Sequence, residues 1–187
     1  ASSMGRLFDA AAAILGLRQY SSYEGQTAME LEAVAGVTRA EPLTMQVHET
    51  TGGLVLDPVP MLAALGEQRQ RGVDVSLLAA CFHESVAHAA ATIAMKVADG
   101  ARIDTVALCG GSFQNARLLS GVRSRLEAVL PPALHPTSPA TLWVLAWRCP
   151  DGPLGPVAVV QLRIGCRSGP RTRPARHARC GARPSTR

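Results

Sequence analysis

Residues 106–115, VALCGGSFQN, carry the clearest chemical signal in this chain. The segment begins with an apolar run typical of a buried strand, continues into Gly110-Gly111, and reaches Asn115 where a helical pattern starts. Glycines let a backbone approach a phosphate closely, and the N–H groups at a helix start attract anions. The spacing predicts a nucleotide-binding turn, although a plain strand–turn–helix connection has the same pattern.

A second group of reactive side chains, His83, Glu84 and His88, could suggest a metal site. The zinc motif of metalloproteases needs two histidines four residues apart, on one face of a helix. Here they are five apart, about 140° around a helix, so they cannot easily bind one ion. We expect them to be core or surface histidines.

The elements that position these residues follow from the apolar spacing, which predicts an α/β fold. Thr27 and Glu30 have the spacing of a capping box, and Gly16 is a suitable helix terminator. Asn115 is a suitable N-cap. The expected helices cover 4–17, 27–36, 57–72, 75–99 and 116–130, and the expected extended segments cover 44–56, with a turn at 52–53, and 104–108.

Four motifs occur in a fixed order: SSMGRLFDAAAAILGL, YEGQTAMELEA, FHESVAHAAATIA and CGGSFQN. Together they resemble the C-terminal part of the HypF-type carbamoyltransferase of NiFe-hydrogenase maturation. That region is similar to the TsaD-type proteins that make threonylcarbamoyl-adenosine in tRNA. The resemblance covers about residues 2–132. It implies one lobe of an actin-like (ASKHA) nucleotide-binding fold.

The resemblance also implies a nucleotide site. Asp9 and Glu30 match carboxylates that face the ribose in the TsaD-type relatives, and Gly25 matches a tight glycine turn whose second glycine is Gln26 here. Asn115 matches an asparagine near the nucleotide. The residues expected to bind the nucleotide are Asp9, Gly25, Glu30, Gly110, Gly111 and Asn115.

By this resemblance the intact protein uses carbamoyl phosphate and ATP to make carbamoyl-adenylate and transfers the carbamoyl group to the C-terminal cysteine of its partner HypE. We expect this chain to be a fragment that is inactive alone, and its sequence assigns no catalytic residue. The family holds a metal through an HxxxH-like and a PPNDGG-like motif, and neither occurs here. We therefore expect no metal site.

Two other functions stay open at this point. A TsaD-like threonylcarbamoyl transferase acting on tRNA is disfavoured, because MGRLFDA stands in place of that family's GEAFDK and YEGQ in place of its YPGGP. A non-catalytic interaction module that kept the lobe and lost the chemistry is the other alternative.

Charge and composition divide the chain near Pro132. Residues 1–132 contain ten Lys and Arg and thirteen Asp and Glu, whereas residues 133–187 contain nine Arg and one Asp. The second segment, rich in Arg, Pro and Gly, suggests a shifted reading frame, and we expect disorder from about Ser168 and an isolated strand over 157–164. The competing interpretation is a basic arm that binds RNA or an acidic partner. Nucleic-acid binding is disfavoured because few aromatic residues are interspersed.

The remaining composition favours a cytoplasmic protein. No stretch reaches the roughly 18–20 uninterrupted apolar residues of a membrane span, and no signal peptide is evident. The five cysteines form no CxxC pair. Cys81 and Cys109 lie in apolar surroundings and are expected to be small buried side chains.

Overall fold

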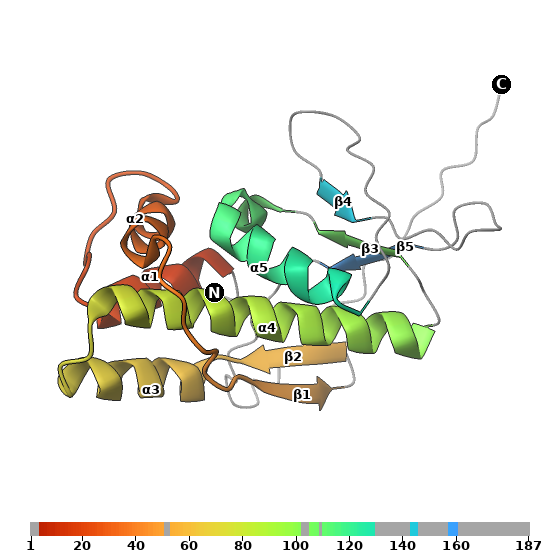
Figure 1. Cartoon of the computed structure of the whole chain (residues 1–187), viewed down its shortest axis with the longest axis horizontal. Coiled ribbons are helices and arrows are strands. Elements are labelled where there is room, and N and C mark those ends of the chain that lie inside the picture. The colour runs from red at the N-terminus through yellow and green to blue at the C-terminus, as the bar shows by residue number, and fades with distance from the viewer. Residues whose placement is uncertain are drawn as a thin grey trace, which may run out of the picture.

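The fold is organised around one long helix, α4 (Val75–Ala101), which crosses the centre of Figure 1. A computed structural model of the chain describes residues 4–50, 53–101, 105–108, 110–129, 143–145 and 157–160. The chain combines helices and strands in a mixed α/β fold, in agreement with the predicted class, although they come mostly in pairs and do not alternate strictly. The other elements are α1 (Met4–Ile14), α2 (Gln26–Ala35), β1 (Gln46–Thr50), β2 (Gly53–Asp57), α3 (Val59–Gln70), β3 (Thr105–Leu108), the 3₁₀ turn η1 (Gly111–Gln114), α5 (Ala116–Glu127), β4 (Trp143–Leu145) and β5 (Val157–Val160).

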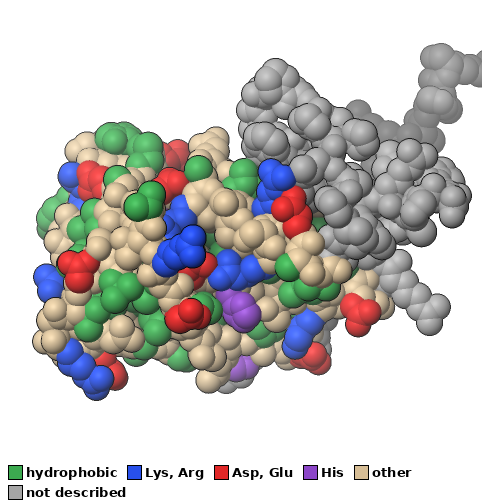
Figure 2. Space-filling view, viewed as in Figure 1, with side chains coloured by type: hydrophobic (Ala, Val, Ile, Leu, Met, Phe, Trp, Pro, Cys, Tyr) green, Lys and Arg blue, Asp and Glu red, His purple; other side chains and the backbone are tan. Residues whose placement is uncertain are grey.

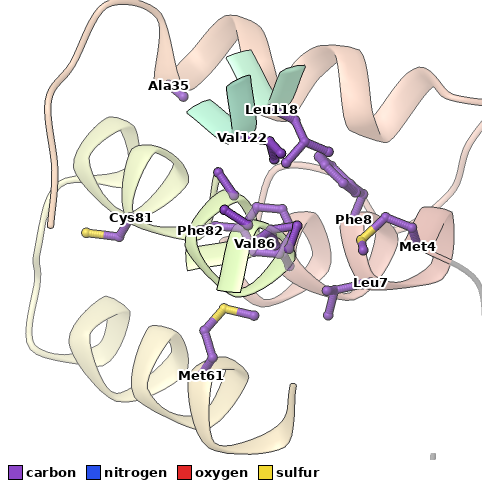
Figure 3. Packing of buried hydrophobic residues seen from close by; sticks show 14 of the residues in the cluster. Met4, Leu7, Phe8, Ala35, Met61, Cys81, Phe82, Val86, Leu118 and Val122 are labelled. Carbon is purple, nitrogen blue, oxygen red and sulfur yellow. The ribbon is translucent and has the colours of Figure 1, made fainter. Parts of the chain in front are cut away.

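The core forms where α1, α2, α3 and α5 pack against α4. Apolar residues that recur at helical spacing within the predicted helix 75–99, from Leu78 through Phe82 and Val86 to Ala90, form a buried stripe along α4, because residues four apart share one face of a helix. Side chains from α1, α3 and α5 converge on this stripe (Figure 3). Farther along the same spacing, Ile93 is only half-buried and Val97 is 40% exposed, while Ala94 and Ala98 take the buried positions.

Most predicted helix ends differ from the structure by one to three residues, and two of the predicted end signals are wrong. Gly100 does not end α4, which continues to Ala101. Thr27 is not the N-cap of α2, since that helix begins one residue earlier, after Gly25 at φ +81°. The predicted capping box is therefore wrong, and both of its side chains bind elsewhere. The end of α1 is as expected: Gly16 and Leu17 donate backbone hydrogen bonds of 3.1 and 2.9 Å that close the helix.

The strands form two separate small sheets. β1 and β2 pair antiparallel, with Val47 opposite Leu56, as the glycine-interrupted extended pattern predicts. β3 is the middle strand of the second sheet, antiparallel to β4 and parallel to β5. The strand expected over 157–164 is thus present over Val157–Val160, and β4 was not predicted. The expected disorder from Ser168 and the frame change near Pro132 concern residues outside the described ranges.

Burial separates α4 from a membrane span. Residues Val75–Gly100 have the length of a span and a mean hydropathy of 1.3, but 72% of this apolar window is buried inside the protein. This is the pattern of a core helix in a soluble protein. Cys81 on the same helix is buried as expected, and burial raises the pKa of its thiol. Cys109 lies outside the described residues.

Helices α4 and α5 cross closely at Gly121. A Cβ atom on Gly121 would lie 2.9 Å from the Cβ of Ala87, which is closer than two carbon atoms can approach. We expect Gly121→Val to lower the free energy of unfolding by about 1–3 kcal/mol, because the overpacked helices must separate. Urea unfolding followed by circular dichroism measures the change.

Gly100→Val is the matched control, since the space around Gly100 is open within 4 Å and the residue also lies in a helix. We expect this control to stay within about 1 kcal/mol of the wild type. Equal stability of the two variants would show that the crossing is not tight.

Candidate functional site

The glycine turn after β3 has a backbone shape that only glycine adopts readily. Gly110 has φ +103° and ψ 161°, outside the regions open to residues with a Cβ atom. The turn is held by a 3.1 Å hydrogen bond from the Phe113 N–H to the Gly110 carbonyl, and the Phe113 side chain is buried. A Cβ atom built on Gly110 or Gly111 would meet no atom of the described residues within 4 Å. The turn therefore leaves its backbone open to an incoming group.

Asn115 joins this turn to α5. Its Oδ1 accepts a 2.8 Å hydrogen bond from the Leu118 N–H, which makes Asn115 the N-cap that the sequence predicts. Its Nδ2 lies 3.1 Å from Nε2 of His83 on α4. The side chain is buried, so its orientation is set by protein partners on both sides.

His83 is a core histidine that links three helices. It is 1% exposed, its Nδ1 lies 2.8 Å from the Ala79 carbonyl, and its ring packs edge-on against Phe8 and Phe82. Burial lowers the pKa of His83, and the hydrogen bond to Ala79 offsets this only in part. His83 is therefore neutral near pH 7. The prediction of a core or surface histidine is confirmed for His83, which is buried, and for His88, which is exposed.

Asp9 and Gly25 line one pocket, of about 540 Å³, between α1 and the loop before α2. Asp9 accepts a hydrogen bond from the Thr27 hydroxyl and lies 3.8 Å from the Arg6 guanidinium. Its side chain is still 44% exposed. A carboxylate has room for about four hydrogen bonds, so Asp9 can accept more donors from a ligand in this pocket.

Glu30 is engaged within the protein. Its Oε2 accepts a 2.6 Å hydrogen bond from Arg18, and its Oε1 accepts one of 3.1 Å from Gln26. The hydrogen bond from Arg18 is the largest cause that lowers the pKa of Glu30, and it also raises the pKa of Arg18. Glu30 does not line the pocket of Asp9.

The predicted residues thus form two groups, with Asp9, Gly25 and Glu30 at α1 and α2 and Gly110, Gly111 and Asn115 at the glycine turn. A buried connection joins them. Phe8, the neighbour of Asp9, lies with its ring centroid 5.5 Å from that of His83, which in turn contacts Asn115.

A charged cluster that the sequence did not reveal lies beside the glycine turn. Glu84 forms ion pairs of 3.4 Å with Arg117 and 2.7 Å with Arg125. Arg117 also donates to the carbonyls of Gly36 and Thr38. The ion pairs join residues that are 33 and 41 positions apart in the sequence. The sequence features that could have indicated them are Glu84 next to His83 and two arginines eight positions apart on one predicted helix.

The cluster lies along a groove of about 1010 Å³ between α4, α5 and the loop after α2. Acidic and basic side chains are intermixed over the face that Figure 2 shows, without a large area of one sign among the coloured atoms. Because each guanidinium has acidic or carbonyl partners, we interpret the cluster as a structural contact that holds α4, α5 and the loop after α2 together. Within the described ranges, no three His, Cys, Asp or Glu side chains come together as a metal-binding group.

Comparison with known proteins identifies relatives of this chain. Residues 1–141 match the family described as carbamoyltransferase, Kae1-like domain, second subdomain. The carbamoyltransferase HypF of Rhodobacter capsulatus is 41% identical over 128 residues, which cover 67% of this chain and 16% of that protein. HypF of Rhizobium leguminosarum bv. viciae is 39% identical over 141 residues, which cover 74% of this chain and 18% of that protein.

A solved structure also relates this chain to HypF. The crystal structure of full-length HypF in its phosphate- and nucleotide-bound form matches with a TM-score of 0.62 and 33% identity, over 67% of this chain and 16% of that one. The chain therefore spans about one sixth of the length of these proteins. The family match ends at residue 141, and the domain boundary near residue 132 stays a prediction.

Proposed function

The chain belongs to the HypF carbamoyltransferase family, and from this we propose that it supplies one wall of a nucleotide site used for carbamoyl transfer. The intact protein, in this proposal, makes carbamoyl-adenylate from carbamoyl phosphate and ATP, with release of phosphate and pyrophosphate, and passes the carbamoyl group to the C-terminal cysteine of HypE. The cysteine loses its thiol proton, its sulfur bonds to the carbamoyl carbon, and AMP leaves with the bonding electrons. The relative solved with nucleotide and phosphate supports ATP as the cofactor.

The observation that carries this proposal is the open backbone of the glycine turn. Among the residues that the structure describes, none comes within 4 Å of a Cβ atom placed on Gly110 or Gly111, at the point where a strand ends and a helix begins. In open α/β sheets, ligands bind beyond the carboxyl ends of strands, and helix N-termini favour phosphate. We assign Gly110 and Gly111 to the phosphates, and Asn115 to the same end of the nucleotide.

The pocket of Asp9 takes the opposite end of the nucleotide in this proposal. An exposed carboxylate suits a ribose, because it accepts hydrogen bonds from two adjacent hydroxyl groups. Gly25 lines the same pocket. Glu30 reaches the ribose only if it gives up Arg18 or Gln26, so we assign it the weaker contact.

We further propose that these elements form one lobe of an actin-like fold and that the chain does not transfer carbamoyl groups alone. It spans about one sixth of its relatives, so most of a two-sided site lies on other parts of such proteins. Turnover by the 187-residue chain in a radiolabelled transfer assay with HypE would contradict this part of the proposal.

Binding of ATP to the chain tests the nucleotide site. With one wall of the site present, we expect a Kd weaker than roughly 10 µM, which corresponds to about −7 kcal/mol. Asp9→Asn should weaken binding further, by about 5–10-fold, because an amide accepts fewer hydrogen bonds than a carboxylate. Chemical-shift titration at millimolar ATP measures both values.

Asp99→Asn is the matched control, since Asp99 is exposed on α4 and does not line the pocket. We expect it to leave the Kd unchanged. Equal affinities for wild type, Asp9→Asn and Asp99→Asn would place ATP elsewhere on the protein.

A further inference from the structure

The hydrogen bonds around His83 fix which ring nitrogen carries the proton. The Ala79 carbonyl can only accept, so Nδ1 at 2.8 Å must be the protonated nitrogen. His83 is neutral, so Nε2 keeps its lone pair and acts as an acceptor. This nitrogen faces Asn115.

The orientation of the Asn115 amide follows in the same way. The Leu118 N–H can only donate, so the atom that it reaches at 2.8 Å is the amide oxygen. The amide nitrogen must then point to His83, where it donates over 3.1 Å to Nε2. Three hydrogen bonds therefore run in one direction, from the first turn of α5 through Asn115 and His83 to the backbone of α4.

Aromatic packing holds the ring in this orientation. The centroid of His83 lies 5.5 Å from that of Phe8 and 5.6 Å from that of Phe82, both at steep interplanar angles. Because the side chain is 1% exposed, water cannot replace either of its partners. The ring is thus fixed by α1 on one side and by its own helix on the other.

We propose that His83 is a positioning residue of the nucleotide site. It holds the Asn115 amide so that the amide oxygen accepts a hydrogen bond from α5 and one amide N–H is left for the ligand. This inference rests on the proposed function. An amide nitrogen carries two hydrogens, and His83 uses one of them. Removal of the acceptor on His83 leaves the amide free to rotate and weakens both the cap and the ligand contact.

The arrangement also makes the site sensitive to acid. When Nε2 of His83 is protonated, its N–H and the side-chain N–H of Asn115 are two donors that face each other. The Asn115 amide must then flip, which withdraws its oxygen from the Leu118 N–H. The charged groups that face His83 are Arg117 on α5, Glu32 on α2 and Glu84 on its own helix. Arg117 opposes the proton and the two glutamates favour it, while burial opposes it most strongly.

Three substitutions of His83 test its hydrogen bonds to Ala79 and Asn115 separately. His83→Gln can place an amide oxygen where Nε2 lies and cannot titrate, so it keeps the acceptor for Asn115. His83→Asn is too short to reach Asn115 but can still donate to Ala79. His83→Leu removes both hydrogen bonds and keeps the apolar volume.

The test combines nitrogen NMR of the side chains with ATP affinity, both followed from pH 7.5 downward. For the wild type we expect the Nδ1–H tautomer at pH 7.5, and a loss of affinity larger than that of His83→Gln at the pH where NMR shows the second proton binding to folded His83. Because ATP itself titrates in this range, the difference between the two proteins is the measure. At pH 7.5, His83→Gln should bind within about 2-fold of the wild type, and His83→Leu and His83→Asn about 5–10-fold more weakly.

The Nε2–H tautomer in the wild type would overturn the inference. So would an Asn115 side-chain amide signal that is the same in His83→Leu as in the wild type. If the wild-type chain binds no ATP, the proposed function fails, and the NMR signals of Asn115 still decide whether His83 positions it.

Discussion

Replacing Phe82 by alanine will lower the free energy of unfolding by about 3–5 kcal/mol, the largest loss expected from any single core truncation here. The side chain is fully buried, and its ring centroid lies 4.9 Å from that of Phe8 in an edge-to-face arrangement. It also contacts His83. The substitution therefore leaves a cavity where α1 meets α4. The expected loss is large because the free energy of unfolding of a folded protein is only about 5–15 kcal/mol.

Denaturant unfolding of Phe82→Ala beside two controls tests this result. Phe82→Leu keeps most of the volume and should lose less than half as much. Leu77→Ala removes a large side chain from the same helix at a position that is 37% exposed, and we expect a loss of about 1 kcal/mol or less. A Phe82→Ala protein as stable as Leu77→Ala would mean that the ring is not in the core.

Local patterns predicted the elements that depend on local physics. The stripe of α4 follows from 3.6-residue periodicity, and the burial of Leu78 and Phe82 confirms it. Asn115 caps α5 because a short polar side chain can reach the N–H three residues on, whatever the rest of the chain does. These features need only a few neighbouring residues.

The incorrect prediction of a capping box has one physical cause, competition from partners distant in sequence. Thr27 has the right type for a cap, but its hydroxyl donates to Asp9, 18 positions earlier. Glu30 has the right spacing for a capping box, but Arg18 binds its carboxylate. In each case a tertiary contact replaced the local one. No spacing rule includes such partners.

The site was predictable by residue type and only partly by geometry. The glycine turn and Asn115 are adjacent in the chain, so their proximity follows from the sequence. The contact between His83 and Asn115 joins positions 32 apart, and the path from Asp9 through Phe8 to His83 joins different helices. These contacts depend on the way α1 and α5 pack on α4.

Acid will destabilise the wild-type chain more than it destabilises His83→Gln. Burial keeps the pKa of folded His83 below its usual value of 6.5, whereas the unfolded chain binds a proton there normally. Below pH 6.5 the unfolded state thus holds more protons than the folded state, and stability falls as the pH falls. This contribution to stability is fully present above pH 6.5.

Its size is bounded by linkage. One excluded proton gives a slope of at most about 1.4 kcal/mol per pH unit, and so at most about 2 kcal/mol between pH 7.5 and pH 5. Urea midpoints at these two pH values, for both proteins, measure the difference. Glu30 and Asp74, whose pKa values are lowered by hydrogen bonds, lose their contributions only at lower pH and are the same in both proteins.

A steeper fall in the wild type would show that the ring is kept neutral by the same burial that holds it against Asn115. Equal pH profiles in the two proteins would mean that folded His83 accepts a proton as easily as the unfolded chain does. The hydrogen bonds to Ala79 and Asn115 could then both hold only above about pH 6.5, because a protonated ring has no acceptor for the amide. The stability measurement therefore tests the positioning of Asn115 without any nucleotide.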